Sequence, residues 1–259
     1  MNALQELLNY KKEKLLSLFF TAGFPKLDDT VSIIKAAESK GIDFLEVGMP
    51  YSDPLADGPI IQQSSMAAIE NGMTIPLLMK QLKEIQGDSK IPLLLMGYLN
   101  PVLQYGVERF LDDAAERGIS GLILPDLPLA EYQEIYQPLF EKRNISPVFL
   151  ITPQTSDERV RLMDSHSNAF IYVVSSAATT GEQKTFGQTQ EAYFDRICSL
   201  QLKNPLIAGF GISNAKNLQQ AWKHFNGGIC GSAFLKKLAS YNTVESALDA
   251  LVAELLMDY

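Results

Sequence analysis

The sequence contains few of the residues that metal and redox sites require. Two of its 259 residues are cysteines, Cys198 and Cys230, and they lie far apart with no spacing typical of a disulfide framework or a metal motif. Both histidines, His166 and His224, lie near the end of a predicted helix rather than at the end of a strand. A metal site needs several converging ligands, so we expect neither a metal nor another cofactor. The scarcity of cysteine is typical of the reducing cytoplasm.

Basic runs and long apolar runs are missing too. The formal net charge is -8, with 30 acidic against 22 basic residues, and no basic run could follow a nucleic-acid backbone, so nucleic acid is not an expected partner. No apolar run reaches the roughly 18 residues of a membrane span. The lysines before the apolar run 15–20 imitate a signal peptide, but acidic residues interrupt them and no small-residue cleavage site follows. We therefore expect run 15–20 to be a first strand.

Short, nearly continuous apolar runs alternate with amphipathic stretches along the whole chain. Strands covered on both faces have this pattern, as in a parallel sheet. The predicted strands are 16–21, 44–47, 92–96, 121–124, 147–151, 170–174, 205–208 and 228–230. The predicted helices are 29–40, 75–85, 107–117, 131–142, 157–165, 193–202, 214–224 and 244–257. Eight of each predict an α/β protein, a (β/α)8 barrel in which residues 1–259 form a single domain and an extra N-terminal helix over 3–14 covers the barrel floor.

The predicted strands are unevenly spaced. Most strand starts lie roughly 22 to 29 residues apart, but the gap is about 48 after strand 2 and about 35 after strand 6. Extra length in a compact domain usually forms a lid or a binding loop. Loops that follow strands lie on the face of a barrel where active sites form. The long loops after strands 2 and 6 therefore predict a pocket that can close.

Glu46 is the one carboxylate inside a predicted strand core. Alternation places it on the same face of the strand as Phe44 and Gly48, pointing either into the barrel or toward the helices. An outward glutamate would be buried between helix and sheet at a cost of several kcal/mol, which favours the inward direction. Burial near the mouth would raise its pKa and keep it usable as an acid near neutral pH. The alternative is a structural glutamate satisfied by backbone amides or a basic partner.

A second carboxylate, Asp57, lies in the loop 51–59 that follows this strand. The prolines and the glycine of this loop restrict or redirect its backbone, which indicates an organised loop. An Asp-Gly pair is more often a plain turn, so Asp57 alone is a weak signal. No predicted strand contains a lysine that could form a Schiff base, so acid/base chemistry by carboxylates is the remaining possibility.

Glycine-containing turns follow the last two strands. Residues 210–213 come after strand 7 and residues 231–233 after strand 8, and each segment precedes a helix. Glycines allow amide N–H groups to approach an anion, and a helix N-terminus adds a favourable dipole. Barrel enzymes often bind phosphate between these two loops. Thr180 and Gly181, in the long sixth loop, could close over the same group; the alternative is that these turns are ordinary helix caps.

Residues 45–62, which read LEVGMPYSDPLADGPIIQ, resemble the signature of the tryptophan synthase alpha subunit family. Further matches are residues 19–25, 98–101, 125–128, 209–213 and 231–232, so the resemblance covers nearly the whole chain. It implies a (β/α)8 lyase of tryptophan biosynthesis that cleaves indole-3-glycerol phosphate to indole and glyceraldehyde 3-phosphate. In this retro-aldol step the protonated indole ring accepts the electrons that an imine or a metal accepts in other aldolases.

The resemblance also implies residue roles. Glu46 matches the acid/base, and Asp57 matches the carboxylate that stabilises positive charge at the indole N–H. The implied substrate-binding residues are Phe19, Met96, Tyr172, Thr180, Gly181, Phe210, Gly211, Gly231 and Ser232, of which the last four form the phosphate cradle. The implied partner is a beta subunit in an alpha-beta-beta-alpha heterotetramer, which receives indole through a tunnel. The implied contact residues are Asp53, Pro54, Asp126, Leu127 and Pro128.

The sequence departs from the family pattern in the sixth loop. Ala178 and Thr179 stand where the family commonly has Gly-Val, and alanine tolerates positive φ poorly, so the lid could differ. Cys230, where a small aliphatic or polar residue is usual, is interpreted as packing. Two alternatives stay open at this point. One is another phosphate-binding barrel, such as a sugar-phosphate isomerase of the same pathway, and the other is a non-catalytic barrel that activates the beta subunit.

Overall fold

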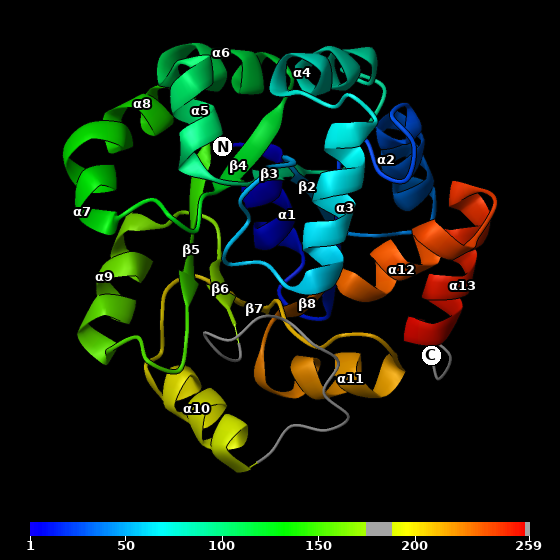
Figure 1. The fold of residues 1–259 in the computed structure, drawn as a ribbon. Helices are drawn as coiled ribbons and strands as arrows, with labels where there is room; N and C mark the ends of the chain where they lie inside the picture. The colour runs from blue at the N-terminus through cyan, green and yellow to red at the C-terminus, as the bar shows by residue number, and fades with distance from the viewer. Residues whose placement is uncertain (175–187, 257–259) are drawn as a thin grey trace.

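A computed structural model describes residues 1–174 and 188–256 of the chain. Its strands close into a parallel barrel in chain order, each one hydrogen-bonded to the next and β8 to β1 (Figure 1). The strands are β1 (Leu15–Thr21), β2 (Phe44–Gly48), β3 (Leu93–Met96), β4 (Ile119–Ile123), β5 (Ser146–Ile151), β6 (Ile171–Val173), β7 (Leu206–Ala208) and β8 (Gly227–Cys230). The predicted (β/α)8 barrel is confirmed.

The strands are buried on both faces, which explains their continuous apolar sequence. All seven residues of β1 are buried. Phe19 and Thr21 face cavities inside the barrel mouth, so by alternation Leu18 and Phe20 face the surrounding helices. Removing both faces from water is the dominant favourable contribution to a barrel core.

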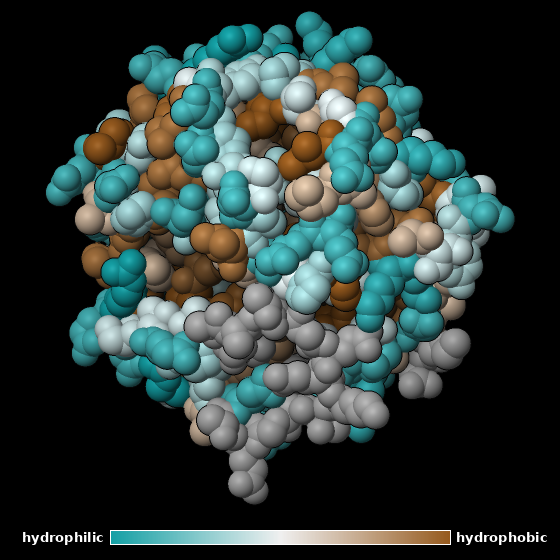
Figure 2. Space-filling view, viewed as in Figure 1, coloured by the Kyte–Doolittle hydropathy of each residue, from teal (hydrophilic) through white to brown (hydrophobic). Residues whose placement is uncertain are grey.

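Helices surround the strands as a ring (Figure 1). They are α2 (Asp29–Ser39), α3 (Pro59–Glu70), α4 (Ile75–Glu84), α5 (Leu99–Tyr105), α6 (Val107–Glu116), α7 (Leu129–Glu131), the π-helix η1 (Tyr132–Tyr136), α8 (Gln137–Lys142), α9 (Asp157–His166), α10 (Gln188–Ser199), α11 (Ala215–His224), α12 (Ser232–Ser240) and α13 (Val244–Leu256). Within the described ranges, no helix is long and apolar enough to cross a membrane. In the same view, Figure 2 shows hydrophilic residues on much of the outer ring and apolar residues sunk between them.

The first helix, α1 (Ala3–Tyr10), closes the floor of the barrel as predicted. Asn2 caps its N-terminus in a capping box with Gln5. The Asn2 side-chain amide also donates to the backbone oxygens of Ser120, at 2.8 Å, and Asn144, at 2.9 Å, beside the starts of β4 and β5. Figure 1 shows α1 in the centre of the view, behind the strands.

Several predicted boundaries need correction, among them the end of the first helix and the extent of the loop after β2. The first helix ends at Tyr10, not at Lys14, because Lys11 is already extended, with φ of -108° and ψ of 113°. Lys14 then adopts a left-handed φ of 55° immediately before β1. The extra length after β2 is a loop over 49–58 followed by the additional helix α3, which has Pro59 in its first turn. Of the second long loop, residues 175–187 lie outside the described residues.

Candidate active site

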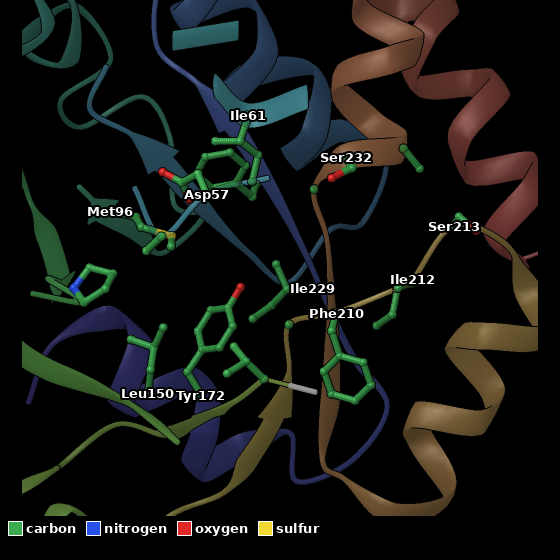
Figure 3. Close-up of a pocket in the computed structure, with 18 residues that line it drawn as sticks. Asp57, Ile61, Met96, Leu150, Tyr172, Phe210, Ile212, Ser213, Ile229 and Ser232 are labelled. Carbon is green, nitrogen blue, oxygen red and sulfur yellow. The ribbon is translucent and has the colours of Figure 1, made fainter. Parts of the chain in front are cut away.

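A cavity opens at the carboxyl end of the strands, where the loops after them meet. It encloses about 890 Å³ of free space, including the part that is open to solvent. Eight residues singled out from the sequence line it: Phe19, Asp57, Met96, Tyr172, Phe210, Gly211, Gly231 and Ser232. Figure 3 shows Asp57 and Met96 on one side of this cavity, and Ser213 and Ser232 on the other. The barrel thus gathers residues from six strand ends or loops into one pocket.

Glu46 is fully buried in the barrel interior and does not itself line the cavity. Its strand register pairs it with Phe19 of β1 and Leu94 of β3, so it shares the inward face with Phe19. Within the described part of the chain, neither carboxyl oxygen has a hydrogen-bond partner of good geometry. No cation is among the described groups that shift the pKa of Glu46. Burial raises the pKa of Glu46 well above its usual range, and the approach of the Tyr172 hydroxyl offsets part of that rise. Burial therefore favours the neutral, protonated form of this carboxyl.

Tyr172 connects this buried acid with the cavity. Its hydroxyl points into the cavity in Figure 3 and lies beside Glu46. Burial raises the pKa of Tyr172 well above its usual range, as do the nearby Glu46 and Asp57 carboxyls. Gly209 leaves room for the ring, because a Cβ at this position would lie 1.8 Å from Cε1 of Tyr172. The phenol is thus fixed as a protonated donor between the two carboxyls.

Asp57 projects into the cavity from the loop after β2. The Tyr98 hydroxyl donates to its Oδ2 at 3.0 Å. Partial burial raises the pKa of Asp57, and the hydrogen bond from Tyr98 lowers it. The two carboxyls therefore have different surroundings. Glu46 is enclosed, whereas Asp57 lies nearer the solvent and accepts a hydrogen bond. Such pairs can divide acid and anionic roles.

The opposite side of the cavity offers backbone amides. Gly211 has a left-handed φ of 62° in the turn after β7, a conformation that favours glycine. Helix α12 begins at Ser232 with no side-chain cap on its first N–H groups, and Asn214 caps α11 nearby. Free N–H groups at a helix start attract anions. The lining residues include no lysine or arginine, so in the described structure an anion here would be held by amides and hydroxyls.

The described residues contain no group of His, Cys, Asp and Glu that could hold a metal ion. Cys230 is fully buried, and burial raises the pKa of its thiol to about 12, which fits its interpretation as packing. Thr180 and Gly181, predicted to close over the phosphate, lie outside the described residues, as do Ala178 and Thr179.

The predicted partner-contact residues follow strands 2 and 4 at the same end of the barrel. Asp53, Asp126 and Pro128 are exposed and Leu127 is half-buried, whereas Pro54 is buried within the chain. Pro54 could therefore act on a partner only by shaping the loop that presents Asp53.

Several lining residues were not predicted from the sequence. Leu150 and Ile229 face inward near the ends of β5 and β8, where alternation along each strand could have identified them. Ile61 comes from α3, a helix that the sequence analysis did not separate from the long loop. Tyr98 was noted only as part of a matching segment, since no local pattern indicates that its hydroxyl reaches the neighbouring loop.

Comparison with known proteins matches this chain to one family throughout. The family described as "Tryptophan synthase alpha chain" matches residues 5–256. The curated tryptophan synthase alpha chain of Flavobacterium johnsoniae is 56% identical over 92% of this chain and 94% of its own length. That of Parabacteroides distasonis is 48% identical over 98% of this chain and 99% of its own.

Solved structures agree with the sequence relatives. A mutant tryptophan synthase alpha-subunit from Pyrococcus furiosus superposes with a TM-score of 0.87 at 30% identity, over 95% of this chain and 99% of that one. Tryptophan synthase from M. tuberculosis in its aminoacrylate-bound form gives a TM-score of 0.85 at 28% identity, over 98% of each chain. The resemblance carried by residues 45–62 is confirmed.

Proposed function

The chain belongs to the tryptophan synthase alpha chain family, and we propose that Glu46 and Asp57 perform its chemistry as acid and anion. The reaction of the family is the retro-aldol cleavage of indole-3-glycerol phosphate to indole and glyceraldehyde 3-phosphate, after which the indole passes to the beta subunit. Membership at this identity displaces the alternative of a sugar-phosphate isomerase.

The proposed proton path conserves atoms and charge. Glu46 donates a proton to the indole carbon that carries the glycerol chain, and the positive charge spreads to the ring nitrogen. Asp57 accepts a hydrogen bond from the ring N–H and stabilises that charge. The Glu46 carboxylate then takes the proton of the adjacent glycerol hydroxyl as the carbon–carbon bond breaks. The bond electrons return to the ring, and Glu46 ends the cycle protonated.

Glu46 has to turn toward the cavity for this step. Its carboxyl is completely buried and lies beside Tyr172 rather than at the cavity surface. Because no hydrogen bond of good geometry and no ion pair holds it among the described residues, rotation breaks no strong interaction. We propose that Tyr172, which reaches both places, guides the carboxyl between them.

The remaining sites follow from the chemistry of the cavity walls. Phe19 and Met96 present apolar surface to the indole ring, and the amides near Gly211, Gly231 and Ser232 receive the phosphate. A wall without basic side chains suits a phosphate that must leave as part of a product.

We also propose the partner surface and the compartment. The mouth residues Asp53, Asp126, Leu127 and Pro128 are proposed to contact the beta subunit, with Thr180 and Gly181 closing over the substrate. The cysteines of the described residues are free, which supports a place in the reducing cytoplasm.

The enclosure of the Glu46 carboxyl on the inward face of β2, beside Tyr172, is the observation that carries this proposal, and burial there raises its pKa. We expect Glu46→Gln to abolish indole release while the substrate still binds, since the amide keeps the shape but cannot supply the proton. We expect Asp57→Asn to lower kcat by roughly 100- to 1000-fold or more, from lost charge stabilisation.

Indole release and substrate binding by calorimetry, measured on the same preparations, test both roles. Substantial turnover by Glu46→Gln would remove that residue from its role. An Asp57→Asn variant within about threefold of the parent would remove the other. Lys35→Gln, a change of an exposed side chain on α2, is the matched control and should leave both measurements unchanged.

A further inference from the structure

We propose that Tyr98 is a positioning residue for this reaction, whose hydroxyl holds the Asp57 carboxylate in the orientation that receives the indole N–H. The inference rests on the role proposed above for Asp57. Tyr98 follows β3 at the N-cap of α5, on a different strand end from the loop that it contacts.

The two hydrogen bonds of the Tyr98 hydroxyl fix its direction. The backbone N–H of Ala56 donates to the phenol oxygen at 3.0 Å. The phenol proton is therefore directed to its other partner, Oδ2 of Asp57, also at 3.0 Å. One side chain thus holds the carboxylate and the backbone immediately before it. Among the described residues no bond engages Oδ1 of Asp57, which leaves this oxygen for a ligand.

Tyr98 is itself anchored without help from Asp57. The backbone N–H of the next residue, Leu99, donates to both carboxylate oxygens of Asp126, at 2.9 and 3.0 Å. The Tyr98 ring packs on Tyr51, with 5.2 Å between ring centroids. Tyr51 belongs to the same loop 49–58 as Asp57, so the anchor outside that loop is the bond from the Leu99 N–H to Asp126. A side chain whose backbone is fixed there can impose a position on a loop residue. The dependence therefore runs from Tyr98 to Asp57.

The polar surroundings make the Tyr98 hydroxyl a lasting donor. Burial, together with the charges of Asp57 and Asp126, raises the pKa of Tyr98 above its usual range, so the phenol keeps its proton. Asp57 and Tyr98 interact electrostatically with one another, Asp57 also with Tyr172, and Tyr98 also with Asp126. None of these four side chains is basic. No cation among them could replace the bond if the hydroxyl were removed.

Tyr98→Phe in the full chain removes the hydroxyl and keeps the ring. We expect kcat for indole release to fall by about 10- to 100-fold, as for the loss of one hydrogen bond to a charged catalytic group. Because the Tyr98 bond lowers the pKa of Asp57, its loss raises that pKa. The acid limb of the kcat profile, where Asp57 must be ionised, should therefore move to higher pH.

Tyr105→Phe is the matched control. It removes the same kind of bond, from the Tyr105 hydroxyl to Oδ2 of Asp113 at 2.6 Å, at the end of the same helix α5 but outside the cavity. This variant should keep both kcat and the acid limb. If Tyr98→Phe changes kcat and the acid limb no more than Tyr105→Phe does, the inference is overturned.

A double-mutant cycle separates this inference from the role of Asp57. If Tyr98 acts through Asp57, adding Tyr98→Phe to Asp57→Asn should lower kcat by less than about twofold further. A further loss as large as in the parent would overturn the inference, because Tyr98 would then act by another route. If Asp57→Asn itself keeps activity, the proposed role of Asp57 fails, whereas a failure of Tyr98→Phe alone leaves that role intact.

Discussion

At the scale of single residues, it is enclosure rather than a partner that favours the neutral form of Glu46. A carboxyl without a good hydrogen bond or a cation is costly to bury in its charged form, so the folded protein holds the proton. Burial without a partner for the charge favours the acid form of Glu46. The same burial should lower the free energy of unfolding once the pH rises.

We predict that Glu46→Gln is more stable than the parent at neutral and alkaline pH. The folded-state pKa is raised above the unfolded value of about 4.5, so the stabilising contribution of the proton is complete below pH 4.5. It is lost as the pH rises through the folded pKa, whereas glutamine does not titrate. The Tm of the variant minus that of the parent should therefore increase with pH, by about 2–4 °C for each kcal/mol of difference.

Thermal unfolding between pH 4 and 9 measures this difference. Glu6→Gln, an exposed change on α1, controls for the general effect of removing a carboxylate. A Tm difference for Glu46→Gln that stays flat across the range would contradict the raised pKa.

The sequence predicts the position of a residue when that position follows from the pattern of its own strand. Glu46 could be placed inside the barrel because alternation and the cost of an outward charge left one direction. Tyr98 could not be identified in this way, because its role depends on a loop 41 positions earlier in the chain. The closeness of Glu46 to Tyr172 likewise depends on barrel closure, which local patterns do not specify.

At the scale of elements, the strands were easier to predict than the helices. Each predicted strand overlaps an observed one, because burial on both faces gives a continuous apolar run. Helix α3 was missed because its buried residues include Ser64 and Ser65, which do not give an apolar stripe. The predicted helix 131–142 begins at Leu129 and contains the π-helical turn η1, which a 3.6-residue period cannot indicate.

The N-terminal helix provides a prediction at this scale. Asn2→Ala removes the cap of α1 and the bonds to the Ser120 and Asn144 carbonyls. We expect a loss of about 1–3 kcal/mol of unfolding free energy, and a Tm lower by roughly 3–10 °C. Thr74→Ala, which removes a cap of α4 alone, should cost less. Chemical denaturation measures both variants, and an equal loss in the two would show that the barrel contacts of Asn2 contribute nothing.

At the scale of the whole molecule, closure of the barrel creates the candidate active site. Phe19 and Ser232, which lie 213 positions apart, line one cavity because β8 pairs with β1. The uneven strand spacing predicted a pocket at this end, but its shape depends on helix starts and ring orientations fixed by packing.

The mouth also gives a prediction about assembly. The loop 49–58 carries Asp57 and the exposed Asp53, so a partner that contacts Asp53 should also order Asp57. We expect the isolated chain to be a poor enzyme and a saturating beta subunit to raise kcat/KM by about tenfold or more. Asp53→Ala should weaken the stimulation, whereas Glu6→Ala, at the opposite end of the barrel, should not. Equal activity with and without the beta subunit would contradict this expectation.

The helix at the barrel floor affects the route by which substrate and product enter and leave the cavity. Among the described residues, α1 lies against the starts of the strands and closes the cavity at its floor, so the cavity opens at the mouth. A protein docked over that mouth would therefore control both the entry of the substrate and the release of the product. We therefore expect freed indole to leave toward the docked protein, because α1 closes the opposite direction.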